Sequence, residues 1–174
     1  GIIAPGMPNV AIQLGEKFGR LMNYGDGLYG GQFVGCMYSA AFFTDSIEEI
    51  INAGLEGIPE ESHYAKCVRD VLKWHKEYPD SWQHTWKRIE EKYRKSFEYQ
   101  KFAEKSKAWI PIDAKLNGAY IVMGLLYGNG NMDSTIIISM RGGKDSDCNT
   151  SKAAGILATS IGYKKLPEKF IAGI

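Results

Sequence analysis

Apolar residues recur every three or four positions along most of this 174-residue chain, and glycine or proline separates one such stretch from the next. This spacing gathers apolar side chains on one face of a helix. The stretch Thr135–Ile138 has strand-forming residues, but it lies isolated among helical stretches, so we expect a helix there too. The sequence therefore predicts an all-α fold, with residues 1–174 forming one compact multi-helix domain.

The expected helices follow these apolar stretches. They cover residues 8–21, 29–43, 46–57, 62–78, 82–99, 116–128, 133–140 and 151–162. The helices at 62–78 and 82–99 are amphipathic, and their charged faces are typical of a solvated surface. The apolar face of the second one carries Trp82, Trp86, Ile89, Tyr93 and Phe97. An interface for an unrelated partner protein would explain the same two stripes, but burial in the core explains them with fewer assumptions.

Charge and hydropathy exclude several functional classes. Lys and Arg number 21 against 20 Asp and Glu, so the net charge of +1 provides no field that would hold nucleic acid or an acidic membrane. The longest apolar run, 119–127, is too short for a bilayer, which needs about 20 residues. Three widely spaced cysteines without zinc-site spacing favour a reducing, cytoplasmic compartment. Nothing in the sequence indicates the oligomeric state.

One short segment has the residue types of a metal site. Asp145 and Asp147 stand two residues apart, between a glycine pair and a small, apolar helix. Two carboxylates so placed suit Mg²⁺, Mn²⁺ or Ca²⁺, and the backbone N–H groups beside them suit a phosphate. An EF-hand loop is excluded because Thr150 and Ile156 occupy its glycine and glutamate positions. Capping of a helix that begins at Ser151 explains the same pair equally well.

A second glycine-rich segment, 25–31, has the composition of a phosphate loop without its lysine or preceding strand. A tight turn between two helices is the simpler interpretation. The histidines show no ligand pairing, and no GxSxG elbow surrounds any serine.

Several short motifs, taken in order, resemble a known family. They are Ala4-Pro5-Gly6-Met7-Pro8, Gly27-Leu28-Tyr29-Gly30-Gly31-Gln32-Phe33, Ala40-Ala41-Phe42, Ile58-Pro59-Glu60-Glu61-Ser62, Asn117-Gly118-Ala119-Tyr120, Leu125-Leu126-Tyr127-Gly128 and Asp145-Ser146-Asp147-Cys148-Asn149. Their order and spacing over nearly the whole chain resemble the ADP-ribosylglycohydrolases related to dinitrogenase reductase-activating glycohydrolase, in particular a bacterial member.

This resemblance implies a helical fold with a centre of two Mg²⁺ or Mn²⁺ ions that binds ADP-ribose or an ADP-ribosylated substrate. Asp145, Asp147 and Cys148 stand at the ligand positions of one half of the centre, although Cys148 replaces a hydroxyl residue. The other half and the catalytic residues are expected upstream of Gly1, so the chain would lack the N-terminal helices of the domain. Residues expected to face the substrate are Asn23, Gly27, Tyr29, Gly30, Gly31, Gly143 and Ser146.

Two functions follow from the resemblance. The first is a metal-dependent glycohydrolase that cleaves an N- or O-glycosidic ADP-ribosyl bond, incomplete in this chain. The second is a non-catalytic ADP-ribose-binding or scaffold domain of the same fold. Cys148 in place of a hydroxyl, and Asn23 where the family often has histidine, favour the second.

Overall fold

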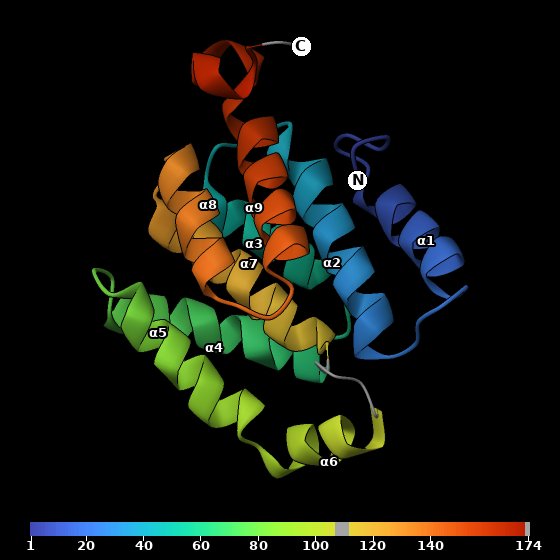
Figure 1. Cartoon of the computed structure of the whole chain (residues 1–174). Coiled ribbons are helices and arrows are strands. Elements are labelled where there is room, and N and C mark those ends of the chain that lie inside the picture. Colours follow the sequence, from blue (N-terminus) through green and yellow to red (C-terminus); the bar gives the residue numbers. More distant parts are fainter. Residues whose placement is uncertain (107–111, 173–174) are drawn as a thin grey trace.

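The computed structural model describes residues 1–106 and 112–172, and within these ranges it contains helices and no strands (Figure 1). The α-helices are α1 (Pro8–Gly19), α2 (Asp26–Ala41), α3 (Ile47–Glu56), α4 (His63–Glu77), α5 (Trp82–Ile89), α6 (Phe97–Ser106), α7 (Ala114–Gly128), α8 (Met132–Arg141) and α9 (Ser146–Ile161). A π-helical turn at Glu90–Arg94 follows α5, and two short 3-10 turns follow α9. The predicted all-α fold is thus confirmed.

Two of the expected helices differ from those observed. The predicted helix at 82–99 is broken, because α5 ends at Ile89, a π-helical turn follows, and α6 begins at Phe97. Phe97 is 66% exposed, so its place on a buried stripe was wrong. The helix predicted from Ser151 begins five residues earlier, at Ser146. The isolated Thr135–Ile138 stretch lies in helix α8, as expected.

Helix α7 lies at the centre of the fold and contacts α2, α3, α4, α5, α8 and α9. Its closest approach is to α8, where Gly124 faces Ser139 and Gly128 faces Thr135. A Cβ atom on Gly124 would lie 3.1 Å from the Ser139 Cα, so only glycine allows this spacing of the two backbones. Burial is accordingly nearly complete along α7, from Gly118 to Leu125.

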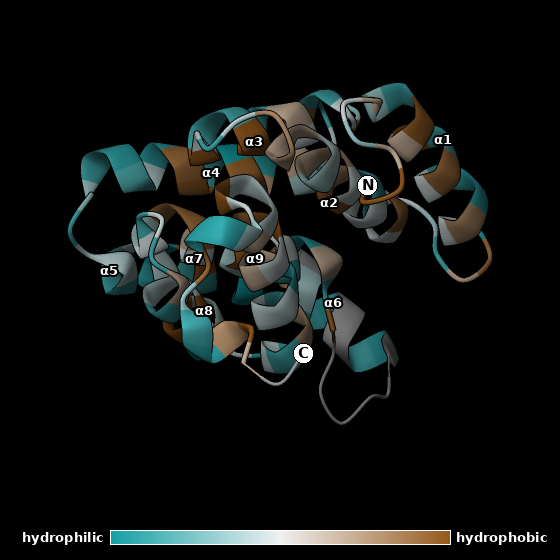
Figure 2. Cartoon of the chain, turned by 90° about the horizontal axis from the view of Figure 1, so that it is seen from above, coloured by the Kyte–Doolittle hydropathy of each residue, from teal (hydrophilic) through white to brown (hydrophobic). Residues whose placement is uncertain are grey.

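Helix α1 lies at the edge of the molecule beside α2 (Figure 2). It buries Ala11, whereas Val10 is 39% and Phe18 is 63% exposed. Leu21, in the turn that follows, is 77% exposed. The predicted helix exists, but its apolar stripe lies mostly at the surface. Among the described residues, none of the helices has the length and apolar character that a bilayer crossing requires.

The N-terminal ends of α2, α4, α7 and α9 lie at one end of the bundle (Figure 1). The Asp26 carboxylate at the start of α2 accepts a hydrogen bond of 3.1 Å from the Tyr64 backbone N–H in α4. The Tyr64 ring in turn lies against Gly30 of α2 and Gly118 of α7. This buried tyrosine fixes three helix starts relative to one another, and α9 begins beside them.

Candidate metal centre

The turn between α8 and α9 sets the geometry of the predicted metal ligands. Gly142 continues the helical conformation of α8, and Gly143 and Lys144 then take φ values of +88° and +65°. The left-handed region suits glycine but strains a lysine. This reversal ends α8 and places Asp145 directly before the first turn of α9.

Asp145 occupies the N-cap position of α9, yet its side chain makes no capping hydrogen bond. An N-cap aspartate normally accepts a bond from a backbone N–H in the first turn. Here the Asp145 Oδ2 atom accepts a hydrogen bond of 3.3 Å from the Asn117 side chain in α7. For Asp145, the capping interpretation is therefore wrong, and its carboxylate faces a neighbouring helix instead.

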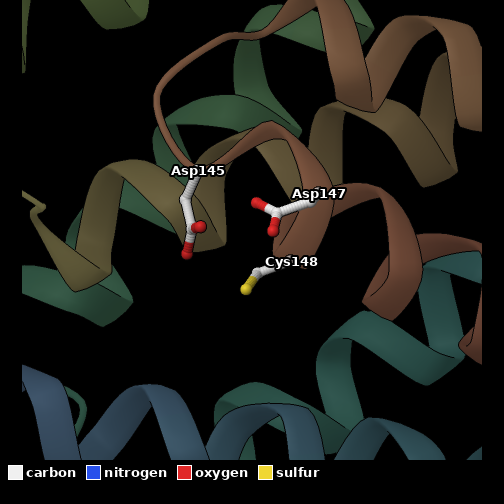
Figure 3. A group of neighbouring side chains, drawn as sticks. All are labelled: Asp145, Asp147 and Cys148. Carbon is white, nitrogen blue, oxygen red and sulfur yellow. The ribbon is translucent and has the colours of Figure 1, made fainter.

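Asp145, Asp147 and Cys148 bring their side chains together at the start of α9 (Figure 3). One ligand atom from each lies within 4.8 Å of the other two. Oxygens on opposite sides of one Ca²⁺ ion are separated by about 5 Å, since each lies at about 2.3–2.6 Å from the metal, so an ion of that size could reach all three. A smaller ion such as Mg²⁺, with ligands at about 2.0–2.1 Å, would require the three atoms to lie within about 4 Å. No other such group of His, Cys, Asp and Glu occurs in the described part of the chain.

The electrostatics of this turn favour an anionic carboxylate and a protonated thiol. Backbone N–H groups of Cys148 and of Asp147 itself lower the pKa of the Asp147 carboxyl, and the positive end of the α9 dipole acts in the same direction. The adjacent Asp145 carboxylate raises the pKa of the Cys148 thiol. Without a cation, Cys148 is therefore a neutral thiol at neutral pH, while Asp147 is charged.

Two asparagines complete this region, and the sequence analysis did not identify them as site residues. Asn149 is fully buried, and its Nδ2 group donates a hydrogen bond of 3.3 Å to the Asn117 Oδ1 atom. Asn117 in turn donates to Asp145. The available signal was the position of Asn149, four residues after Asp145 and hence one helical turn away once α9 is known to start at Ser146.

The two expected substrate-facing residues near α9 differ in whether they are already in contact with other parts of the protein. Gly143 has nothing within 4 Å of the position where a Cβ would stand, so space remains open beside it. Ser146 instead donates its hydroxyl to the Met140 carbonyl at 3.1 Å, which ties the start of α9 to the end of α8.

The expected residues from Asn23 to Gly31 span the end of the loop before α2 and the first turns of α2, so the segment 25–31 is mostly helix and not the tight turn expected from the sequence. Asn23 packs against Gly27, where an added Cβ would stand 3.1 Å from the Asn23 Oδ1 atom. Gly30 faces the buried Tyr64 ring, whereas Gly31 is exposed, with open space around its Cα. Tyr29 is half-buried. The structure thus brings this segment to the same end of the bundle as Asp145, through Tyr64 and α7.

Comparison with known proteins places the chain in a family. A family model described as ADP-ribosylglycohydrolase matches residues 1–174. No curated protein and no solved structure gives a significant match. The family description indicates glycohydrolase activity on ADP-ribosyl bonds, and the Asp/Asp/Cys group gives a possible metal site for it. Because the match covers the whole chain, the protein belongs to the ADP-ribosylglycohydrolase family.

Proposed function

We propose that this chain supplies one half of a metal centre in a glycohydrolase that cleaves an N- or O-glycosidic ADP-ribosyl bond. The observation that carries the proposal is the Asp145 carboxylate, which leaves the backbone of its own helix uncapped and lies beside Asp147 and Cys148. Among the residues that the structure describes, the Asp145 carboxylate has no ion-pair partner and caps no helix, so it is available as a ligand. Mg²⁺ and Mn²⁺ suit these two carboxylates, because hard cations prefer oxygen ligands.

In this proposal Asp145 and Asp147 bind the cation, and Cys148 contributes weakly. Such a cation, when bound, would polarise ribose oxygens and help to generate a nucleophile from water. Two carboxylates alone leave most of the coordination positions of a divalent ion open for substrate, water and further ligands. A second ion of the centre, and the group that activates water, would require residues beyond this group.

The helix starts around Tyr64 support a site for the ADP-ribose diphosphate. Helix starts attract anions through their first-turn backbone N–H groups, although those of Asp147 and Cys148 already donate to the Asp147 carboxylate, and that of Gly27 donates to the Tyr24 carbonyl. Gly31 and Gly143 have open space beside them, which allows a ligand to approach the backbone closely. Asn23, Gly27, Tyr29 and Ser146 flank these two places, and we propose that they contact the nucleotide.

Calorimetric titration of the chain with ADP-ribose, with and without Mn²⁺, tests this function. We expect binding that requires Mn²⁺ and is lost in Asp145→Asn and Asp147→Asn. Asp80→Asn is the matched control, because Asp80 is exposed at the distant start of α5. Metal-independent binding, or equal binding by all three variants, would contradict a role for Asp145 and Asp147 in the site.

A non-catalytic ADP-ribose-binding domain is the second candidate, and Cys148 is the observation that favours it. A neutral thiol is a poor ligand for a hard cation. Release of ADP-ribose from a modified peptide in the presence of Mn²⁺ separates the two candidates. Turnover supports the hydrolase, whereas Mn²⁺-dependent binding without turnover supports the binding domain.

A further inference from the structure

We propose that Asn117 is a positioning residue that orients the Asp145 carboxylate for the cation, and that Asn149 fixes the orientation of the Asn117 amide. This inference rests on the proposed metal half-site and extends it to residues outside the turn that carries the ligands. It predicts that metal affinity depends on an amide in α7 that does not itself touch the metal.

The hydrogen bonds run in one direction through the three side chains. Asn149 donates from Nδ2 to the Asn117 Oδ1 atom, and Asn117 donates from Nδ2 to the Asp145 Oδ2 atom. The donor and acceptor atoms are 3.3 Å apart in both hydrogen bonds. Because the Asn117 oxygen accepts from Asn149, its NH₂ group must face Asp145. A flipped amide would present its oxygen to the carboxylate and its NH₂ to another NH₂ group.

The backbone around Asn117 is held rigidly. Asp113 caps α7 by accepting hydrogen bonds from the backbone N–H groups of Lys115 and Leu116, at 2.9 and 3.4 Å. Gly118, which follows Asn117, lies so close to Tyr64 that an added Cβ would stand 2.1 Å from the Tyr64 hydroxyl oxygen. With both flanks fixed, the Asn117 amide offers its donor at a constant position.

We infer that the two carboxylate oxygens of Asp145 have different roles, one as hydrogen-bond acceptor and one as metal ligand. Oδ2 accepts from Asn117. This bond holds the carboxylate toward α7 and away from the first-turn N–H groups of α9, where it would act as an ordinary N-cap. One carboxylate oxygen of Asp145 lies within 4.8 Å of the ligand atoms of Asp147 and Cys148, and the oxygen that does not accept from Asn117 keeps its lone pairs for a cation. Partners that orient a metal ligand in this way are generally needed for full affinity.

Mn²⁺ alone is the probe that tests this inference, with affinity measured by calorimetry and free Mn²⁺ followed by electron paramagnetic resonance. We expect Asn117→Ala to weaken Mn²⁺ binding by about 10- to 100-fold, the usual effect of losing an outer partner of a metal ligand. Asn149→Ala should also weaken binding, but it should add nothing in the Asn117→Ala background, because Asn149 acts through Asn117.

Asn131→Ala separates positioning from general stability. Asn131 caps α8 at the opposite end of α7, and its side chain accepts a hydrogen bond of 2.9 Å from the Ser134 backbone N–H. Its loss should lower the melting temperature and leave Mn²⁺ affinity unchanged. A comparable fall in melting temperature without a change in Mn²⁺ affinity in Asn117→Ala would overturn the positioning role.

Asp145→Asn distinguishes this inference from the proposed function beneath it. If Asp145→Asn abolishes Mn²⁺ binding while Asn117→Ala binds like the wild type, the half-site is real and the positioning role is wrong. If Asp145→Asn has no effect, or if the wild-type chain does not bind Mn²⁺, the half-site itself is refuted. Additive effects of Asn117→Ala and Asn149→Ala would show that Asn149 acts by another route.

Discussion

Gly142→Ala tests whether the turn that carries the proposed metal ligands is held in place by close packing. Gly142 lies against Tyr120 of α7, and a Cβ added to it would stand 2.9 Å from both the Cβ and the Cγ atoms of that side chain. Tyr120 is fully buried and hydrogen-bonded to Glu90, so it cannot move aside easily. The Gly142 carbonyl is also fixed, because it accepts a hydrogen bond of 3.0 Å from the Trp86 indole.

The expected effect is a balance of two contributions. Overpacking of this kind costs about 1–3 kcal/mol in the free energy of unfolding. Gly142 has φ −54° and ψ −32°, which alanine adopts without strain. Alanine also lowers the conformational entropy of the unfolded chain, which stabilises the folded state by about 0.4–1 kcal/mol. We expect a net loss of about 1–2 kcal/mol, or about 2–8 °C in melting temperature for a chain of this length.

Urea denaturation followed by circular dichroism measures the change, with Gly35→Ala as the matched control. Gly35 lies inside α2, and an added Cβ would have its nearest neighbours at 3.9 Å, an ordinary contact distance. The same substitution should therefore stabilise the chain there by about 0.5–1 kcal/mol. If Gly142→Ala proves as stable as the wild type, Tyr120 does not hold the turn, and the packing argument fails.

Three further predictions concern individual side chains. Cys148→Ser should weaken Cd²⁺ binding and leave Mg²⁺ or Mn²⁺ binding equal or stronger, because thiolates prefer soft cations; unchanged Cd²⁺ affinity by calorimetry would exclude the sulfur as a ligand. Burial lowers the pKa of His75 in the folded state. The contribution of His75 to the free energy of unfolding should therefore be fully present above about pH 6.5 and be lost as the pH falls through the pKa of the folded state. Thermal melts of His75→Gln should lose this pH dependence, whereas those of His63→Gln should keep it. Glu90→Gln should lower the free energy of unfolding by about 1–3 kcal/mol in urea denaturation, since the buried carboxylate accepts hydrogen bonds from Tyr120 and Arg94. A loss under about 0.5 kcal/mol, the effect of an ordinary surface substitution, would contradict that role.

The helical fold could be predicted from sequence because burial has a simple period in an α-helix. The apolar stripe of α4 is a clear case, since Cys67, Val68 and Val71 are all fully buried. The π-helical segment after Ile89 and the break at Lys95–Ser96 could not be predicted, because Tyr93 and Phe97 continue the same helical spacing. The π-helical segment from Glu90 places this carboxylate in the core against Tyr120, and that pairing joins residues 30 positions apart.

The early start of α9 was missed for a local reason. Asp, Ser and Asn have low helix propensity, because their side chains compete for backbone hydrogen bonds. The segment 145–150 therefore looks like a turn before a helix. Packing outweighs this preference, since Asn149 is fully buried one turn into α9 and bonds to α7. The two carboxylates could be selected from sequence, but the Asn117 amide that bonds to Asp145 could not, because it depends on this tertiary contact.

Three departures from ordinary local chemistry lie between Lys144 and Asn149. Lys144 has a strained backbone, Asp145 leaves its helix uncapped, and the Asn149 Oδ1 atom is buried without a hydrogen-bond partner in the described structure. An uncapped helix end alone costs about 1 kcal/mol, and a buried unpaired oxygen about 1–3 kcal/mol. Capping of α9 by Asp145 would remove the first of these costs. These unfavourable terms in one turn are consistent with the proposed ligand site, and, if that proposal is right, Mn²⁺ should stabilise this turn more than any other part of the fold.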